Sequence, residues 1–349
     1  MEECTGRQNV FQYRILLVPM RRRDAIGLLV SVPIVPGWPR TLLARQQGKI
    51  WRIGDILSYG PPDIVSPIAK ALERCLADLG YVQGLNLTYS HAIAAPQPEK
   101  LEQTIRTLVP DIDLLVVAGA LGGIAARNVG VTIPTIFVNV GDPVSIGLVE
   151  SLPHPGGNMT GITFEAATDT YGKRLQILKE IIPGLERVAV LGAAKDLNVD
   201  LATQSLERAA PQLRVALVPI HLQSAGELES AFATMKQSGS QAVVVVAGAL
   251  TYTNSKRIAD IALASGLPSM HGLRDTVIAG GLVALGPDLV EIIRQAARQI
   301  DKIIKGQHPA DIPVEQPTRY AICVNLKTAR ALDLTIPQSL LALADEIIE

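Results

Sequence analysis

Several signatures of catalysis are missing from this 349-residue sequence. The three cysteines lie far apart and form no C-x-x-C pair, so neither a disulfide framework nor a cysteine zinc site is expected. The five histidines lack the H-E-x-x-H spacing of a metalloprotease, and neither a G-x-S-x-G nor a Walker A motif occurs. We therefore expect no metal, no cofactor and no nucleophilic catalysis.

The sequence also lacks an excess of charge. Its 32 basic and 33 acidic residues give a formal net charge of −1, and no run of Lys and Arg occurs outside the N-terminus. A nucleic-acid partner is therefore not expected. Aromatic residues make up only 4%, whereas hydrophobic residues reach 48%. That composition can fill large cores, and the length favours two domains.

The first 47 residues differ from the rest. Three arginines at 21–23 precede an apolar run over 25–35, and the segment ends in polar residues with one alanine. This order is typical of an export signal, and the run is too short and too rich in proline to span a bilayer. We expect residues 1–47 to direct export to the periplasm, with a twin-arginine route suggested and Met20 as a plausible start. A disordered or amphipathic extension is the alternative.

The remaining sequence alternates short apolar strands with amphipathic helices, in two successive sets. Strands are predicted at 50–60, 86–90, 113–118 and 135–138, and again at 187–191, 215–220, 242–246 and from 268. This pattern predicts an α/β fold of two parallel-sheet lobes with a boundary near Thr163. The segments 289–305, 320–324 and 326–349 must pack back onto one lobe or the other, which indicates more than one passage between the lobes.

Polar groups and glycines follow several predicted strands, where open α/β sheets bind ligands. Gly119 and Ala120 open a helix and can bind an anion through backbone N–H groups, or can simply form a close-packed turn. Asp142, after the fourth strand, can bind an ammonium group or cap a helix. Arg274 can clamp a carboxylate or pair with Asp275.

A set of short motifs, spread in order over residues 50–349, resembles the tryptophan-binding-like substrate-binding proteins of ABC transporters. The motifs are VGDPV at 140–144, GLV at 147–149, PGGNMTG at 155–161, KRL at 173–175, IPG at 182–184, GGL at 280–282, GPD at 286–288, PVEQPT at 313–318, NLKTA at 325–329 and ADEIIE at 344–349. The resemblance implies a type I periplasmic-binding fold: two doubly wound parallel-sheet lobes joined by a hinge, with three passages of the chain between them and a ligand enclosed between the lobes. In this fold residues 50–163 plus about 284–310 would form lobe 1, and 164–283 plus about 311–349 would form lobe 2. It also implies delivery of a small solute to a membrane permease.

Two positions depart from the family pattern. Ala120 and Leu121 stand where the family usually has Thr-Pro, and Gly192 and Ala193 stand where it usually has Trp-Asn. Both positions face the cleft in this fold. The missing hydroxyl and aromatic surface argue against an aromatic amino acid as ligand.

The sequence thus predicts a monomeric, exported solute-binding protein rather than an enzyme, with a small carboxylate-bearing solute such as an amino acid as its ligand. A ligand-sensing domain of the same fold, acting on a signalling partner, is the alternative. Ser58 and the backbone at Gly119 and Ala120 are expected to bind the carboxylate, and the two tyrosines to form walls with polar tips. The residues expected to line the site are Ser58, Tyr59, Gly119, Ala120, Asn139, Tyr252 and Arg274.

Overall fold

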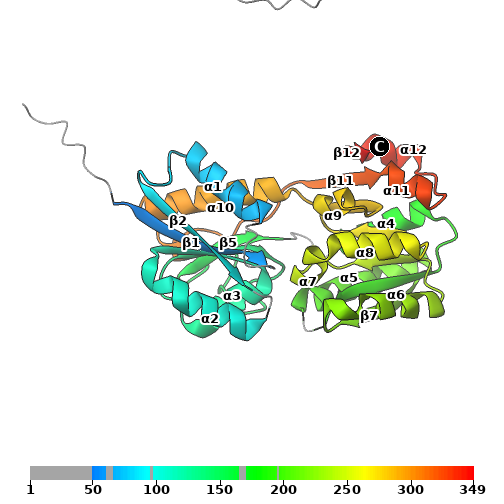
Figure 1. Cartoon of the computed structure of the whole chain (residues 1–349), viewed down its shortest axis with the longest axis horizontal. Coiled ribbons are helices and arrows are strands. Elements are labelled where there is room, and N and C mark those ends of the chain that lie inside the picture. Colours follow the sequence, from blue (N-terminus) through cyan, green and yellow to red (C-terminus); the bar gives the residue numbers. More distant parts are fainter. Residues whose placement is uncertain (1–48, 60–65, 95–96, 165–169, 195) are drawn as a thin grey trace, which may run out of the picture. The chain divides into compact units, whose positions relative to one another are not determined.

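The computed structural model describes residues 49–59, 66–94, 97–164, 170–194 and 196–349, without the side chains of Ser58 and Tyr59. Within this part of the chain the strands form two separate sheets, each flanked by helices (Figure 1). The expected export signal at residues 1–47 lies outside the described residues. Among the residues described, no helix is long and apolar enough to cross a membrane.

The first sheet has five strands in the order β2-β1-β3-β4-β5, and every neighbouring pair is parallel. Its strands are β1 (Trp51–Tyr59), β2 (Leu87–Ala94), β3 (Leu114–Ala118), β4 (Thr135–Val140) and β5 (Met159–Thr163). Its helices are α1 (Pro67–Asp78), α2 (Pro98–Leu108), α3 (Gly119–Val129) and α10 (Leu289–Ile304), with short 3-10 turns η1 (Val109–Asp111) and η3 (Pro309–Asp311). Side chains of α1 and α10 pack on one face and those of α2 and α3 on the other. A parallel sheet covered on both faces needs apolar strands, as β3 shows with all five residues buried.

The second sheet has seven strands in the order β12-β11-β10-β9-β8-β6-β7. Its strands are β6 (Arg187–Ala193), β7 (Ala216–Leu222), β8 (Ala242–Val245), β9 (Ser269–His271), β10 (Val283–Pro287), β11 (Tyr320–Asn325) and β12 (Glu346–Ile348). Its helices are α4 (Thr170–Ile181), α5 (Leu197–Leu213), α6 (Leu228–Gln237), α7 (Ala249–Thr253), α8 (Ser255–Ala264), α9 (Arg274–Ile278), α11 (Leu326–Ala331) and α12 (Gln338–Leu343), with the 3-10 turn η2 (Ala225–Glu227). Among the described strands of this sheet, β10 and β11 pair in antiparallel fashion and the other neighbouring pairs are parallel.

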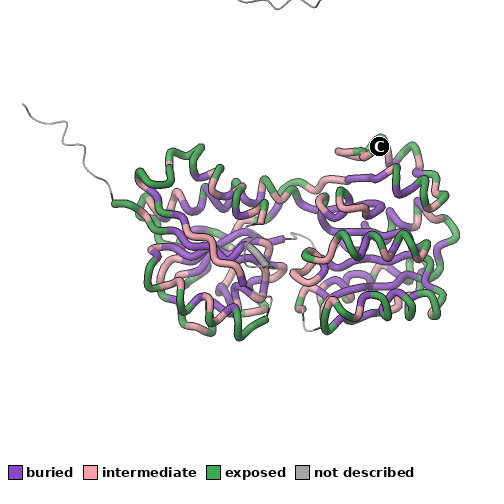
Figure 2. Tube along the Cα trace, in the orientation of Figure 1, coloured by how far each residue is buried: buried purple, intermediate pink, exposed green. Residues whose placement is uncertain are grey.

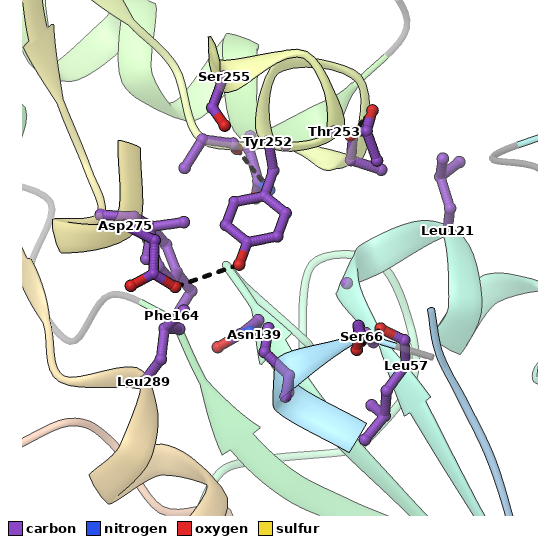
Figure 3. A pocket seen from close by; sticks show the side chains of 18 of the residues that line it. Leu57, Ser66, Leu121, Asn139, Phe164, Tyr252, Thr253, Ser255, Asp275 and Leu289 are labelled. Carbon is purple, nitrogen blue, oxygen red and sulfur yellow. Dashed lines mark hydrogen bonds between the residues drawn. The ribbon is translucent and has the colours of Figure 1, made fainter. Parts of the chain in front are cut away.

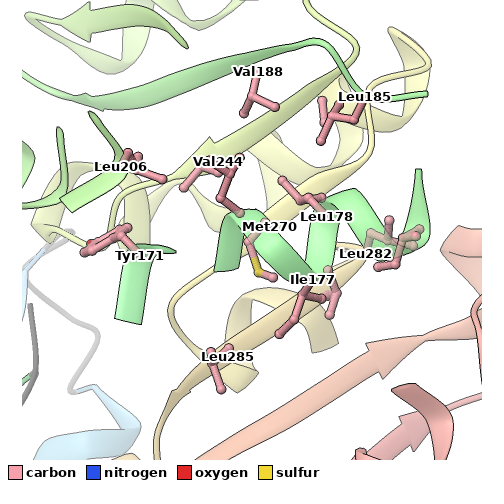
Figure 4. Close-up of a cluster of buried hydrophobic side chains, with 14 of the residues drawn as sticks. Tyr171, Ile177, Leu178, Leu185, Val188, Leu206, Val244, Met270, Leu282 and Leu285 are labelled. Carbon is pink, nitrogen blue, oxygen red and sulfur yellow. The ribbon is translucent and has the colours of Figure 1, made fainter. Parts of the chain in front are cut away.

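Each sheet carries its own hydrophobic core. Burial runs along the strands and the sheet-facing sides of the helices, whereas exposed residues lie on the outer sides (Figure 2). In the larger core, Leu178 of α4 and Leu206 of α5 pack against Val188 and Val244 of the strands (Figure 4). Each sheet has hydrophobic clusters on both of its faces, and we call the first sheet with its helices lobe 1 and the second lobe 2.

The chain passes between the two sheets three times: between β5 and α4, between β10 and α10, and between η3 and β11. The sequence places the second passage at about 284 and the third at about 311. In the structure β10 belongs to lobe 2 as far as Pro287, and Val314 still packs in a core of lobe 1. Both passages therefore lie a few residues later than expected.

Candidate functional site

A cavity of about 390 Å³ is lined by residues from both lobes (Figure 3). Most of them follow the carboxyl end of a strand, where ligand sites form in open parallel sheets. Lobe 1 contributes Leu57, Ser66, Pro67, Ile68, Ala118, Gly119, Ala120, Leu121, Asn139, Phe164 and Leu289, and lobe 2 contributes Asp196, Asn198, Ala247, Gly248, Ala249, Tyr252, Thr253, Ser255, Leu273 and Asp275. The walls are mainly apolar, with few polar groups, as is usual for small-molecule sites.

On the lobe 1 side, the N-terminus of α3 opens onto the cavity. Gly119 has a φ of 68°, in the left-handed region that glycine adopts without strain, and this lets β3 turn directly into the helix. Among the side chains that the structure describes, none caps α3, and its first turn has no acidic residue. Its first backbone N–H groups carry partial positive charge and can therefore bind an anion in the cavity.

Asn139 has an unusual backbone conformation beside this helix end. Its φ is 59°, which few residues other than glycine adopt, and the register of β4 against β5 shifts at this position. The side-chain oxygen Oδ1 is buried and has no hydrogen-bond partner within the described structure. A buried acceptor without a partner is costly, so Asn139 offers a contact to a ligand donor.

On the lobe 2 side, Asp275 and Tyr252 form a polar pair. The Tyr252 hydroxyl donates a hydrogen bond of 3.2 Å to Asp275 Oδ2, the dashed line toward Asp275 in Figure 3. Burial first, and then the charge of Asp275, raise the pKa of Tyr252, so the phenol stays protonated and remains a donor. The half-buried Asp275 carboxylate has further acceptor positions that can bind a cation.

Asp196 is the second carboxylate of the cavity. Its Oδ1 accepts a hydrogen bond of 3.0 Å from the Asn198 backbone N–H and so caps α5. Burial raises the pKa of Asp196, because it disfavours the charged form. A Cβ added at Gly248 would come within 2.3 Å of Asp196 Oδ2, so the small residue there makes room for this carboxylate.

The charges of the cavity are thus arranged unevenly. Among the lining residues that the structure describes, the charged side chains are the carboxylates Asp196 and Asp275, and no Lys, Arg or His lines the space. Both carboxylates belong to lobe 2, whereas the uncapped helix end belongs to lobe 1. This arrangement suits a small molecule with a cation at one end and an anion at the other.

The structure brings together four of the seven residues that the sequence indicates. Gly119, Ala120, Asn139 and Tyr252 line the cavity. The Ser58 and Tyr59 side chains lie outside the described residues.

Arg274 points elsewhere. It forms two hydrogen bonds with Glu346 of β12, one of 2.7 Å from Nη2 and a shorter one from Nε, and Nη1 lies 3.7 Å from Asp275. It lines a neighbouring cavity of about 540 Å³. In this structure Arg274 forms ion pairs within the protein and is not placed to clamp a solute carboxylate.

Two further expectations change in detail. Asp142 caps a turn rather than a helix: Oδ1 accepts from the backbone N–H groups of Val144 and Ser145, and no helix follows in the described chain before β5. Of the two departures from the family pattern, Ala120 and Leu121 line the cavity. Gly192 and Ala193 do not, and a Cβ at Gly192 would come within 2.3 Å of the Val199 side chain.

Sequence reasoning missed the two carboxylates as binding groups. Asp275 was considered only as a partner of Arg274, and Asp196 was not considered. Both stand just before or at the start of a helix that follows a strand of lobe 2, so the strand-end rule could have found them.

The chain matches a known protein family over most of its length. The model of the family described as "ABC transporter substrate binding protein" matches residues 63–348. The chain belongs to this family. Its members are solute-binding proteins that work with ABC permeases and are not enzymes, and the resemblance indicated by the sequence motifs is confirmed.

Individual proteins resemble the chain in sequence and in fold. The chain is 25% identical over 266 residues to a tyrosine-binding protein of Clostridioides difficile, and the match covers 76% of each chain. A domain from Streptococcus pneumonia solved in complex with L-Trp matches with a TM-score of 0.77 and 21% identity, over 85% of this chain and 99% of that one. A conserved domain protein from Vibrio cholerae matches with a TM-score of 0.78 and 23% identity, over 86% of this chain and 100% of that one. The predicted fold of two type I periplasmic-binding lobes is confirmed.

Proposed function

We propose that this solute-binding protein is the exported receptor of an ABC importer and that its ligand is an amino acid or a closely related zwitterion. The observation that carries the proposal is the opposed polarity of the cavity, with carboxylates on lobe 2 and the uncapped N-terminus of α3 on lobe 1. The ligand carboxylate would bind the backbone N–H groups at Gly119 and Ala120. Its ammonium group would bind Asp275.

The remaining cavity groups fit this orientation. The Asn139 Oδ1 atom, which lacks a partner, can accept a second hydrogen bond from the ammonium group. Leu57, Ile68, Phe164 and Leu289 provide apolar surface for a side chain. The names of two relatives, a tyrosine-binding protein and a complex with L-Trp, support an amino acid as the ligand class.

The binding mode also accounts for a transport function. A ligand whose two charged ends bind different lobes interacts most strongly when the lobes close on it, so it favours the closed state. A permease can then distinguish loaded from empty receptor by shape. We propose export by the N-terminal segment, a monomeric receptor and a membrane permease as its partner.

The proposal predicts a strict requirement for both charged ends of the ligand. In a thermal-shift screen of the twenty protein amino acids, at least one is expected to raise the melting temperature, because it binds only the folded state. Its N-acetyl derivative and its amide should each bind at least about 30-fold more weakly in calorimetry, because each loses a charge-assisted interaction of about 2 kcal/mol.

The deaminated acid and the decarboxylated amine of the same amino acid are matched probes that each keep one end. If the acid bound as tightly as the amino acid, the role of Asp275 would be disproved, and tight binding of the amine would disprove the role of α3. A screen in which sugars shift the melting temperature and no amino acid does would refute the ligand class.

A further inference from the structure

A buried ion pair lies in lobe 1, outside the cavity. Asp55 of β1 is fully buried and stands directly opposite His91 of β2 in the parallel register. His91 Nδ1 lies 2.7 Å from Asp55 Oδ2, and since a carboxylate only accepts, Nδ1 donates. On the other side of the ring, Nε2 lies 3.7 Å from the Glu73 carboxylate of α1.

Both ring nitrogens therefore face carboxylates, which favours the doubly protonated imidazolium. The hydrogen bond to Asp55 raises the pKa of His91, against a smaller opposing effect of burial. Tyr89 is the remaining titratable neighbour: its buried ring packs 4.8 Å from the His91 ring, and burial and Asp55 raise its pKa, so it stays neutral. Within the described chain, no other charged group forms an ion pair with Asp55 or His91.

A chain of hydrogen bonds connects this pair to the cavity wall. Asp55 Oδ1 accepts from the Leu57 backbone N–H at 3.0 Å, at the point where the register of β1 against β2 shifts. The Leu57 carbonyl accepts from Ser66 Oγ at 3.0 Å, and Ser66 Oγ in turn accepts from the Ala69 N–H at 3.2 Å and caps α1. Leu57 and Ser66 both line the cavity and lie close together in Figure 3.

We propose that Asp55 and His91 are positioning residues for the solute site, which hold the irregular end of β1 and the start of α1 in the geometry that binds the solute. A buried carboxylate needs a compensating charge. If His91 loses its proton, the cation opposite the buried Asp55 carboxyl group is lost, and the segment that Asp55 holds through Leu57 loosens. Solute binding is thereby linked to the charge of a histidine that does not touch the solute.

The sign of the pH dependence follows from the raised pKa of His91. The stabilisation that protonated His91 provides is fully present below the pKa of about 6.5 that histidine has in the unfolded chain. It is lost as the pH rises through the higher pKa of His91 in the folded protein. Loosening is therefore expected as the pH rises above about 6.5.

The first test needs no solute. Hydrogen exchange by NMR at the Leu57 and Ala69 amides, corrected for the intrinsic rate, is expected to show about tenfold weaker protection at about pH 8.5 than at about pH 6. His91→Gln should show the weak protection at both pH values, whereas His91→Lys, which keeps a cation, should remain protected at both. His221→Gln, an exposed histidine of β7, is the matched control and should behave as the unaltered protein does.

The second test uses solute binding, and this arm rests on the proposed function. The melting-temperature shift caused by a mixture of the twenty amino acids should decrease with pH in the unaltered protein and not in His91→Lys. A purely structural pair would lower the melting temperature without moving exchange at Leu57, and that result would overturn the proposal. A mixture that gives no shift at any pH would count against the amino acid ligand alone, because the exchange experiment would still decide the role of His91.

Discussion

Asp275→Asn is expected to weaken binding of the amino acid found in the screen by about 100-fold, with little change in the melting temperature of the empty protein. Asparagine keeps the shape and can still accept from the Tyr252 hydroxyl, but it removes the charge that binds the ammonium group. Loss of a charge-assisted hydrogen bond in a closed site corresponds to about 2–3 kcal/mol. Titration calorimetry measures the change directly.

Two variants show whether the effect comes from this charge. Tyr252→Phe removes only the hydroxyl that orients Asp275 and should weaken binding by about tenfold or less. Asp260→Asn makes the same substitution in lobe 2 at an exposed carboxylate paired with Lys256, and binding should not change. If Asp275→Asn bound the amino acid with unaltered affinity, the ammonium contact would have to lie elsewhere, with Asp196 as the remaining described carboxylate.

The parts of the site that could be predicted are those determined by local sequence. The run Leu114–Ala118 followed by Gly119 indicates a buried strand that turns into a helix, and the structure has this arrangement. Asn139 lies at the end of a β-branched and aromatic strand, where the rule that ligands bind at strand ends puts a candidate contact, and it lines the cavity. In both cases the backbone direction alone fixes which groups reach the site.

The parts that could not be predicted depend on contacts between distant segments. Arg274 turns toward Glu346, 72 residues later, and no local pattern reveals that β12 lies within its reach. The adjacent Asp275 therefore faces the cavity in its place. The strands Met159–Thr163 and Val283–Pro287 were also not among the predicted strands, because each contains glycine and is short. Both are buried through pairing with neighbouring strands of their sheets, which a single sequence does not show.

The other large effect is expected at the opposite end of the cavity. Ala120→Asp should reduce affinity for the same amino acid by at least about 100-fold, because the new carboxylate would occupy the anion site at the N-terminus of α3 and repel the carboxylate of the ligand. The same substitution should lower the stability of the empty protein only slightly, because the favourable interaction of an acidic residue with the helix dipole offsets part of the cost of burying its charge.

A large loss of affinity with only a small change in stability separates this mechanism from misfolding. Ala120→Asn adds nearly the same volume without the charge, and it should cost less than about tenfold in affinity if the anion site is electrostatic. Calorimetry of both variants, together with their urea unfolding curves, provides the comparison. Equal losses in the two variants would show that the wall at Ala120 acts by shape alone, and the ligand carboxylate would then have to bind away from α3.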